Sequence, residues 1–516
     1  MTTPLTQIPA NMQPPYIEQK TFVSNGKGQT WSGESTQVFS PIYIDGKPQL
    51  LGSQPMFDEA QSLQVLDAAV KAYAGGDGAW PKMPVVERIH YMNLFISNMT
   101  KKREQVVNSL MWEIAKPRKD SEKEFDRTIE YMKKTMESLE ELSRSYSLQS
   151  HEGVMSRDGR SPFGVTFSVA PFNYPLNETY TTLIPALLMG NTVVLKPAKN
   201  GALLHEPLLD AYAQSFPPGV VNTLYGDGFK VIPPIMKSGK VDVLAFIGSN
   251  GASNAIQKMH PDPNKLTSIL GLGAKNIGIV LPTSNLEEAA SEVVAGSLSF
   301  NGQRCTALKQ LFIHSAVYDE FMSLYVPKVQ NLVKGMPWTP NVSITPLLDM
   351  NQVKRMDDYV KDALNKGAQL VCGGDWENTL YSPAVLANVD KSMLVYNEEQ
   401  FGPVVPVTKF SRLAEPIEYA TQSPLGQQAS VFGYDPIAVS ALVDGLKDKV
   451  SRINLNAQCQ RGPDVYAFTG KKASAKGVLS IRDALLAFSL PNMVAAKDNA
   501  RNRELYAELK KHSQFF

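Results

Sequence analysis

The stretch SFNGQRCTAL, residues 299–308, links a helix-like run over 286–298 to a strand-like run over 310–314, and the rest of the chain is organised around it. Within this stretch, Cys305 lies in a polar loop beside Arg304, whose positive charge is fixed. A nearby cation lowers the pKa of a thiol and favours the nucleophilic thiolate. The loop therefore suggests a reactive cysteine. The competing interpretation is an ordinary packed cysteine, since cysteine is among the most buried residue types.

The composition of the 516-residue chain is that of an ordinary soluble globular protein, and its length implies two or three domains. Lys and Arg number 51 and Asp and Glu number 50, so the chain has no global field for nucleic acid. Its three widely spaced cysteines give neither a disulfide framework nor a zinc pattern, so no metal is expected. The first 16 residues lack a signal-peptide pattern, and no run approaches the ~18 apolar residues of a membrane span. We expect a cytoplasmic protein with neither membrane nor nucleic-acid partners.

Short β-branched runs alternate with helical segments from 165 to 281, and a second such set extends from 311 to 455. This alternation predicts α/β domains with parallel sheets, whose carboxyl strand ends commonly hold dinucleotides. A hairpin is expected around Asp45-Gly46. Residues 1–35, rich in Pro, Gly, Gln and Ser, are expected to form a loosely ordered arm. Helices are expected over 60–74, 85–99, 104–114 and 117–146.

Polar residues at predicted strand ends are candidates for chemistry. Asn173, in PFNYPLN after a strand, could donate a hydrogen bond to an oxygen that gains negative charge, although turn asparagines are commoner. Lys196 and Lys199, in LKPAK, could reach a ribose or a phosphate, or could simply be exposed loop lysines. Ser249, in FIGSNG, begins a predicted helix whose N–H groups suit a pyrophosphate. No Gly-x-Gly-x-x-Gly fingerprint opens a βα unit.

These segments, in this order, resemble those of the aldehyde dehydrogenase superfamily. The resemblance rests on GQRC before Thr306, PFNYP, FIGS and the EEQFGP segment that contains Glu399, and it extends over 42–494. It implies an α/β fold with two parallel-sheet domains and a small β arm that pairs across subunits, giving a homodimer or homotetramer. The implied division is an N-terminal arm over 1–35, an NADP-binding domain over 36–146 and 163–284, a catalytic domain over 285–484, and an oligomerisation arm and C-terminal tail over 147–162 and 485–516.

The resemblance also implies roles for the site residues. Cys305 would attack the aldehyde carbon, and Asn173 would bind the resulting oxyanion together with the Cys305 backbone N–H. A glutamate stands at the position of Lys199 in NAD-preferring members, so the cation here predicts NADP, whose 2′-phosphate it attracts. The residues implied in cofactor binding are Lys196, Lys199, Gly248, Ser249, Leu272, Glu399 and Phe401.

Three arginines favour one branch of the family, the NADP-dependent non-phosphorylating glyceraldehyde-3-phosphate dehydrogenases. Taken singly, each arginine is better explained as a structural or surface residue, but guanidinium forks suit bidentate phosphate binding. The residues that would hold the phosphate, or another anionic end of the substrate, are Arg127, Tyr174, Arg304, Thr306 and Arg461.

Gly271 departs from the family pattern. The family segment Glu-Leu-Gly-Gly-Lys supplies a glutamate that activates the deacylating water, whereas here ILGLGAKN places Gly271 at that position. Loss of a positioned general base typically costs ~10²–10⁴ in rate, so thioester hydrolysis is the threatened step. Glu398 or Glu399 could act instead, another acceptor such as coenzyme A could take the acyl group, or the chain could be an altered or weakened cofactor-binding relative. A semialdehyde dehydrogenase, whose substrate carries a carboxylate in place of the phosphate, is a further alternative.

Overall fold

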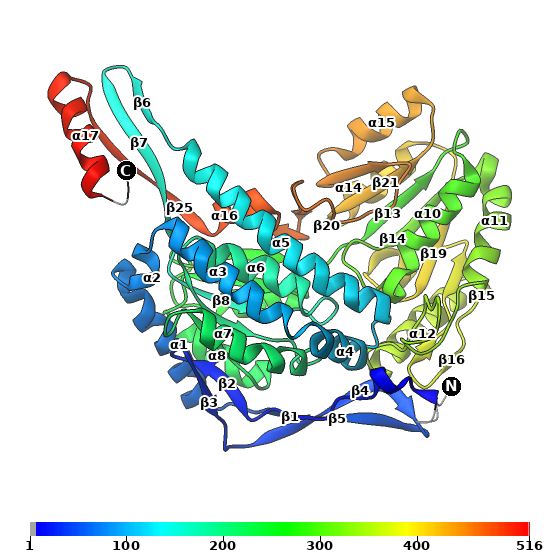
Figure 1. Cartoon of the computed structure of the whole chain (residues 1–516). Coiled ribbons are helices and arrows are strands. Elements are labelled where there is room, and N and C mark those ends of the chain that lie inside the picture. The colour runs from blue at the N-terminus through cyan, green and yellow to red at the C-terminus, as the bar shows by residue number, and fades with distance from the viewer. Residues whose placement is uncertain (1–6, 514, 516) are drawn as a thin grey trace.

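Two large β-sheets form the body of the molecule in the computed structural model, which describes residues 7–513 and 515 (Figure 1). The first sheet has six strands in the order β10-β9-β8-β11-β12-β24. Its first five strands run parallel, and β24 is antiparallel to β12. The strands are β8 (Val165–Val169), β9 (Thr192–Lys196), β10 (Val221–Thr223), β11 (Val243–Ile247), β12 (Thr267–Gly271) and β24 (Ala475–Lys476). Their near-continuous burial is typical of parallel strands covered on both faces.

The second sheet has seven strands in the order β15-β18-β19-β14-β13-β21-β22, of which only the β15–β18 pair is antiparallel. The strands are β13 (Asn276–Val280), β14 (Leu308–His314), β15 (Gln369–Cys372), β18 (Ala384–Ala387), β19 (Val404–Phe410), β21 (Gln428–Phe432) and β22 (Arg452–Leu455). The predicted border at 284–285 is corrected here, because β13 pairs with β14 and β21 in this sheet. The change of sheet therefore falls before Asn276.

Helices connect these strands, and the four helices expected before residue 147 are confirmed as α1, α3, α4 and α5. No helix in the described part of the chain is long and apolar enough to cross a membrane. The helices are α1 (Glu59–Tyr73), α2 (Ala79–Lys82), α3 (Val85–Thr100), α4 (Arg103–Ile114), α5 (Arg118–Ser145), α6 (Asn177–Leu188), α7 (Leu209–Ser215), α8 (Gly228–Lys237), α9 (Asn250–Lys258), α10 (Leu286–Leu298), α11 (Tyr318–Gln330), α12 (Met350–Asn365), α13 (Leu394–Asn397), α14 (Ala414–Gln422), α15 (Pro436–Leu446) and α16 (Ile481–Ala487).

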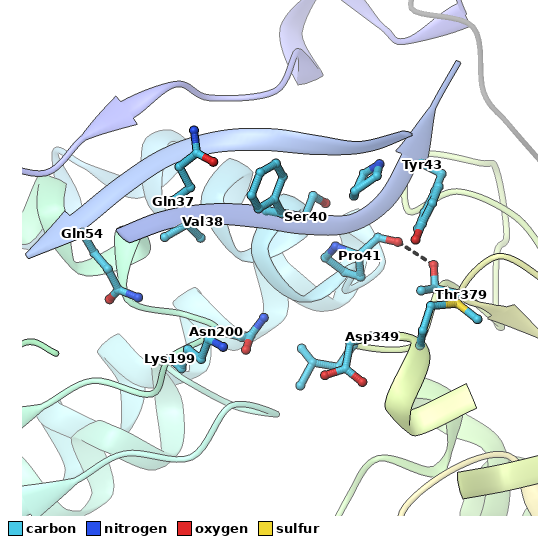
Figure 2. Close-up of a pocket in the computed structure, with 14 residues that line it drawn as sticks. Gln37, Val38, Ser40, Pro41, Tyr43, Gln54, Lys199, Asn200, Asp349 and Thr379 are labelled. Atoms are coloured by element: carbon cyan, nitrogen blue, oxygen red, sulfur yellow. Dashed lines mark hydrogen bonds between the residues drawn. The ribbon is translucent and has the colours of Figure 1, made fainter. Parts of the chain in front are cut away.

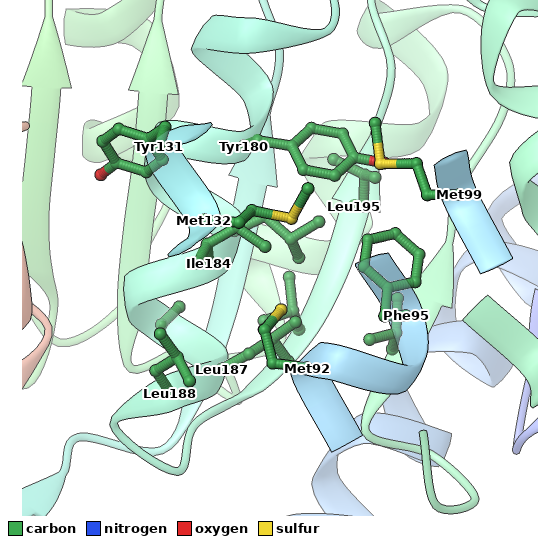
Figure 3. Close-up of a cluster of buried hydrophobic side chains, with 14 of the residues drawn as sticks. Met92, Phe95, Met99, Tyr131, Met132, Tyr180, Ile184, Leu187, Leu188 and Leu195 are labelled. Carbon is green, nitrogen blue, oxygen red and sulfur yellow. The ribbon is translucent and has the colours of Figure 1, made fainter. Parts of the chain in front are cut away.

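The largest apolar core surrounds α6, every residue of which is buried. Figure 3 shows Phe95 from α3 and Met132 from α5 facing Tyr180 and Ile184 from α6. Burial of this much apolar surface holds the helix in one place, since roughly 25 cal/mol is gained per Å² removed from water. The first turn of α6, where the candidate site begins, is therefore rigidly placed.

A small antiparallel sheet projects from the body and carries the last helix, α17 (Ala500–His512) (Figure 1). It consists of β6 (Leu148–His151), β7 (Val154–Pro162) and β25 (Ser489–Lys497), with β25 paired to β7 along its full length. The predicted fold class, two parallel-sheet units with a small β arm, is confirmed. That the arm joins subunits stays a prediction.

The N-terminal segment is more ordered than its composition suggested. Residues 17–30 contain three short strands, and Phe22 and Val23 are buried. The Val23 backbone N–H donates to the Thr223 hydroxyl at 2.9 Å, which ties the segment to β10. The predicted loose arm is therefore wrong for this part of the chain, and residues 1–6 lie outside the described residues. The strands are β1 (Ile17–Glu18), β2 (Thr21–Ser24), β3 (Lys27–Thr30), and the predicted hairpin pair β4 (Ser35–Ile44) and β5 (Lys47–Pro55).

Candidate active site

A cavity of about 430 Å³ lies against the loop that precedes β14. Its wall comes from α5, the first turn of α6, the loop itself and the segment 458–462. The structure therefore brings together residues that are more than three hundred positions apart in sequence. The predicted residues that line it are Cys305 and all five of the substrate-binding set: Arg127, Tyr174, Arg304, Thr306 and Arg461.

The backbone before Cys305 is held in an unusual conformation. Phe300, Asn301 and Gly302 all have positive φ, at 49°, 56° and 69°. The Asn301 side chain accepts from the Thr345 N–H at 2.9 Å and donates to the Thr345 carbonyl at 3.0 Å, which fixes the turn. A Cβ on Gly302 would lie 2.8 Å from two backbone oxygens, so the position requires glycine. Strain of this kind concentrates at functional sites, where surrounding structure over-determines it.

Burial raises the pKa of the Cys305 thiol above its usual value near 9.0, and the carboxylate of Glu178 adds to the rise. The cations Lys309 and Arg461 oppose it, as does a hydrogen bond from the Gln427 side chain. Of these two cations, Lys309 is bonded directly to Cys305, because its Nζ donates to the Cys305 backbone carbonyl at 3.1 Å. Burial and Glu178 therefore favour the protonated thiol over the thiolate.

Arg304 does not activate the thiol, contrary to the prediction from its place in the sequence. Its guanidinium donates to the carbonyl oxygens of Ala295 at 3.0 Å, Gly296 at 2.8 Å and Ser299 at 3.2 Å. These carbonyls lie at the end of α10, where the partial negative charge of the helix attracts cations, and the Ala295 carbonyl also accepts from the Ser299 N–H. Arg304 directly precedes Cys305 in sequence, but its guanidinium binds the carbonyl oxygens at the end of α10.

Asn173 is buried and bonded to the loop that carries Cys305, but it is not among the residues that line the cavity. The Asn173 Nδ2 donates to the Gln303 backbone carbonyl at 3.0 Å. The backbone carbonyl of Asn173 accepts from the Lys116 Nζ at 3.0 Å. Lys116 is fully buried, forms an ion pair with Glu124, and sits 3.5 Å from the centre of the Tyr174 ring. A rigidly held amide of this kind suits an oxyanion donor, and that role stays a prediction.

Two of the three cavity arginines are already paired with carboxylates. Arg127 donates to Asp464 through Nε at 3.1 Å and Nη2 at 2.7 Å. Arg461 forms an ion pair with Glu178, and its Nη2 donates to the Leu479 carbonyl at 2.8 Å. Sequence reasoning missed Glu178 and Asp464, although Glu178 lies only five residues beyond Asn173 and Asp464 three beyond Arg461. Lys116, Lys309 and Gln427 were missed as well, and nothing local in the sequence marks them.

Two of the predicted cofactor residues, Lys196 and Ser249, lie at the end of β9 and at the start of α9. Lys196, at the end of β9, is buried, and its only hydrogen-bond acceptor among the described residues is the Pro197 carbonyl at 3.3 Å. Burial lowers the pKa of Lys196 to about 8, although the nearby Asp227 carboxylate opposes this shift. The buried ammonium lacks the partners that a ribose or phosphate would supply. Ser249 caps α9, and a side chain at Gly251 would meet open space. The start of a helix suits a pyrophosphate, although the Ser249 hydroxyl already accepts from the Ala252 N–H at 3.3 Å.

Glu399 and Phe401 are connected to the Cys305 loop through Lys309. The Glu399 carboxylate pairs with Lys309 at 2.5 Å, and Lys309 Nζ is 5.3 Å from the centre of the Phe401 ring. Phe401 has a positive φ of 46°, which marks a constrained turn. Lys309 thus links the nucleophile loop to the segment expected to meet the nicotinamide ribose.

Lys199 follows Lys196 by three residues in the loop after β9. It is exposed and lines a second cavity of about 240 Å³, with Gln54 on β5 and Asp349 at the start of α12 (Figure 2). No other predicted cofactor residue in the described part of the chain lines that cavity. The role of Lys199 in cofactor binding stays a prediction.

Gly248, Gly271 and Leu272 meet where β11 and β12 end. The Gly248 N–H donates to the Gly271 carbonyl at 3.0 Å, and the Leu272 N–H donates to the Ser474 carbonyl at 2.9 Å. A Cβ on Gly271 would lie 3.4 Å from Ile247 and 3.5 Å from Leu479, which is ordinary contact. The position therefore has room for a side chain and does not require glycine for packing. In the described residues, no group of three or more His, Cys, Asp or Glu side chains could hold a metal ion.

Comparison with known proteins agrees with this arrangement. The aldehyde dehydrogenase family model matches residues 31–494, and the chain belongs to the aldehyde dehydrogenase family. An NADP-dependent glyceraldehyde-3-phosphate dehydrogenase of Streptococcus equinus is 31% identical over 457 residues, covering 87% of this chain and 93% of that protein. The Arabidopsis thaliana protein of the same name is 28% identical over 90% of this chain and 92% of its own length.

A solved structure is similar over nearly its whole length. The NADP-dependent glyceraldehyde-3-phosphate dehydrogenase of Bacillus halodurans C-125, complexed with NADP, superposes with a TM-score of 0.85 at 28% identity. The match covers 92% of this chain and 99% of that chain. The family and the nucleophile loop together define an NAD(P)-dependent aldehyde dehydrogenase.

Proposed function

We propose that this enzyme oxidises glyceraldehyde 3-phosphate, or a similar anionic aldehyde, to the acid with NADP, through a thioester on Cys305. The observation that carries the proposal is the shared cavity, whose lining includes Cys305 together with Arg127, Arg304 and Arg461. Arginines beside a reactive cysteine suit an aldehyde with an anionic end, even though carboxylates in the same lining offset much of their charge. The names of the two relatives and of the Bacillus structure support the same substrate.

The reaction begins when the Cys305 thiolate adds to the aldehyde carbon. Asn173 Nδ2 and the Cys305 backbone N–H donate to the oxygen that becomes negative, and such donors are worth roughly 10²–10³ in kcat. Lys309, held against the Cys305 carbonyl, favours the thiolate. A nicotinamide nucleotide, when bound, would supply the hydride acceptor, and loss of a hydride from the adduct would leave a thioester on Cys305. Lys196, Ser249 and Glu399 would hold the nucleotide.

Release of the acyl group is the slow step in this proposal. Gly271 can neither take a proton nor order a water through a side chain. Glu398 and Glu399 are engaged elsewhere, since Glu398 accepts from the Tyr359 hydroxyl at 3.0 Å and Glu399 pairs with Lys309. This engagement favours a second candidate, in which a thiol such as coenzyme A takes the acyl group. If nothing releases the acyl group efficiently, the same scheme describes a catalytically weakened relative that still binds the cofactor.

The test is rapid mixing of enzyme and NADP with phosphorylated, carboxylated and apolar aldehydes, read by NADPH absorbance. We expect a burst of about one NADPH per active site with glyceraldehyde 3-phosphate, followed by slow turnover that added coenzyme A either accelerates or leaves unchanged. The Cys305→Ser enzyme should show no burst. Apolar aldehydes that burst and turn over better than phosphorylated ones would reject the substrate assignment.

A further inference from the structure

Arg461 is the cavity arginine with the least access to water. The residue is only 7% exposed, and its Nε has no hydrogen-bond partner in the described structure, although Asp464 lies 3.5 Å away. One guanidinium face meets the carboxylate of Glu178, and Nη2 is committed to the Leu479 carbonyl. An incoming anion that is to bind Arg461 must therefore share it with Glu178.

Glu178 cannot easily withdraw from this position. It lies in the first turn of α6, which is buried along its whole length, and the residue itself is 8% exposed. The neighbouring Asn177 N–H donates to Glu124 at 3.0 Å, and the Glu178 N–H donates to the Tyr174 carbonyl at 3.1 Å. These bonds anchor the backbone from which the carboxylate projects into the cavity wall.

The charges that line the cavity nearly cancel. Four lining side chains are cationic and three are anionic, and one of the cations, Arg127, is further bound to Asp464. The effect of Glu178 extends to the nucleophile, because its carboxylate is the largest electrostatic influence that raises the pKa of Cys305. The four cations are Lys123, Arg127, Arg304 and Arg461, and the three anions are Asp120, Glu124 and Glu178.

We propose that Glu178 is a specificity-determining residue that acts as an internal competitor for the anionic end of the substrate. It occupies Arg461 while the cavity is empty and repels a second anion that binds there, because like charges close together in a partly buried site interact strongly. Glu178 thereby weakens binding of phosphorylated aldehydes relative to uncharged ones. This inference rests on the proposed function, since it assumes that an anionic substrate end enters this cavity.

The test measures anion binding without turnover. Iodoacetamide, which is neutral, alkylates Cys305 in the full-length enzyme while inorganic phosphate is titrated in, and mass spectrometry of the Cys305 peptide follows the rate. Each variant is referenced to its own rate without phosphate, so that changes in thiol reactivity cancel. We expect Glu178→Gln to lower the half-protecting phosphate concentration by roughly tenfold or more. Glu140→Gln, which removes the same charge from an exposed pair with Arg144 on α5, should leave it unchanged.

Kinetics supply a second readout. Glu178→Gln should lower KM for glyceraldehyde 3-phosphate and leave KM for uncharged glyceraldehyde unchanged, which a general disturbance of the cavity would not do. If Glu178→Gln does not fold, Glu178→Leu gives the same test with the same expectation. Unchanged or weaker phosphate protection in the folded variant, or no protection of any form, would overturn the inference.

The two proposals can fail separately. Wild-type activity with glyceraldehyde 3-phosphate and no change in phosphate protection on substitution would remove the role of Glu178 and leave the proposed function intact. Tighter phosphate protection in Glu178→Gln, with no NADPH from glyceraldehyde 3-phosphate in any form, would remove that substrate and leave the internal competitor.

Discussion

The side chain of Asn173 donates a hydrogen bond to the carbonyl oxygen of Gln303 at 3.0 Å, and so joins the end of β8 to the loop that carries Cys305. The two residues lie in loops beside strands of different sheets and are 130 positions apart in sequence. This contact sets where the carboxamide lies relative to the sulfur. It makes Asn173 both a structural tie and a candidate oxyanion donor.

Asn173→Ala should lower the burst rate with the best aldehyde by about 10²–10³, because the oxyanion loses a donor. The loss in unfolding free energy should be only about 1 kcal/mol, the usual worth of one hydrogen bond. Stopped-flow NADPH formation and chemical denaturation measure the two effects. Asn98→Ala, which removes a similar amide bonded to Ser215 at 3.1 Å, is the matched control and should leave the burst intact. A burst rate within threefold of wild type in Asn173→Ala would exclude the oxyanion role.

The pH profile of Cys305 alkylation in the cofactor-free enzyme should have its midpoint above 9.0, because burial and Glu178 raise the thiol pKa. Lys309→Met should move the midpoint higher, since removal of a cation disfavours the thiolate. Gln427→Leu should do the same by removing a hydrogen bond to the sulfur. Arg304→Met should leave it in place, because that guanidinium binds the end of α10. A large upward shift in Arg304→Met alone would contradict the structure.

Lys196→Met should stabilise the cofactor-free enzyme at pH 7 while weakening cofactor binding. The pKa of Lys196 falls from 10.5 to about 8 on folding, so the unfolded chain binds more protons between those values. Unfolding free energy therefore rises with pH across that window, and the full penalty, up to roughly 3 kcal/mol, is present below it. Denaturation at pH 7 and at pH 10 should show the variant's advantage shrinking at high pH. An advantage independent of pH would mean that packing, and not the buried charge, is its source.

Gly271→Glu should restore hydrolysis. A Cβ at 271 meets its neighbours at 3.4–3.5 Å, so a side chain can start there without displacing the backbone. We expect the steady turnover rate to rise at least tenfold, toward the ~10²–10⁴ that a positioned base supplies. The burst should then no longer be distinguishable from the steady phase. Gly271→Gln has the same size without the base and should keep the burst. Equal turnover in both variants would show that acyl transfer is limited by something other than a missing carboxylate.

Lys199→Glu should reverse the cofactor preference. Wild-type kcat/KM should be higher with NADP than with NAD, and the carboxylate should lower the NADP value by about tenfold or more through repulsion of the 2′-phosphate. Lys447→Glu, at an exposed lysine paired with Asp444, controls for overall charge. A wild-type preference for NAD would show that Lys199 is not part of the cofactor site. That outcome would agree with the position of Lys199 beside the second cavity.

Much of the fold was predictable because periodicity is a local property. The alternation of short β-branched runs and helices predicted the parallel sheets, and the turn at Asp45-Gly46 predicted the β4–β5 hairpin. Sheet membership was not local. β13 has the same apolar pattern as the strands before it, and only its pairing with β14 and β21 shows which sheet it joins.

The sequence by itself determined which residues are candidates for the chemistry and the order in which they come, since GQRC, PFNYP and the strand-end lysines are short and contiguous. Tertiary structure alone decided what those charges do. Arg304 adjoins Cys305 in sequence yet binds helix carbonyls, while Arg461 meets Glu178, a residue 283 positions away. Electrostatic energy depends on separation in space and on burial, neither of which a linear sequence states.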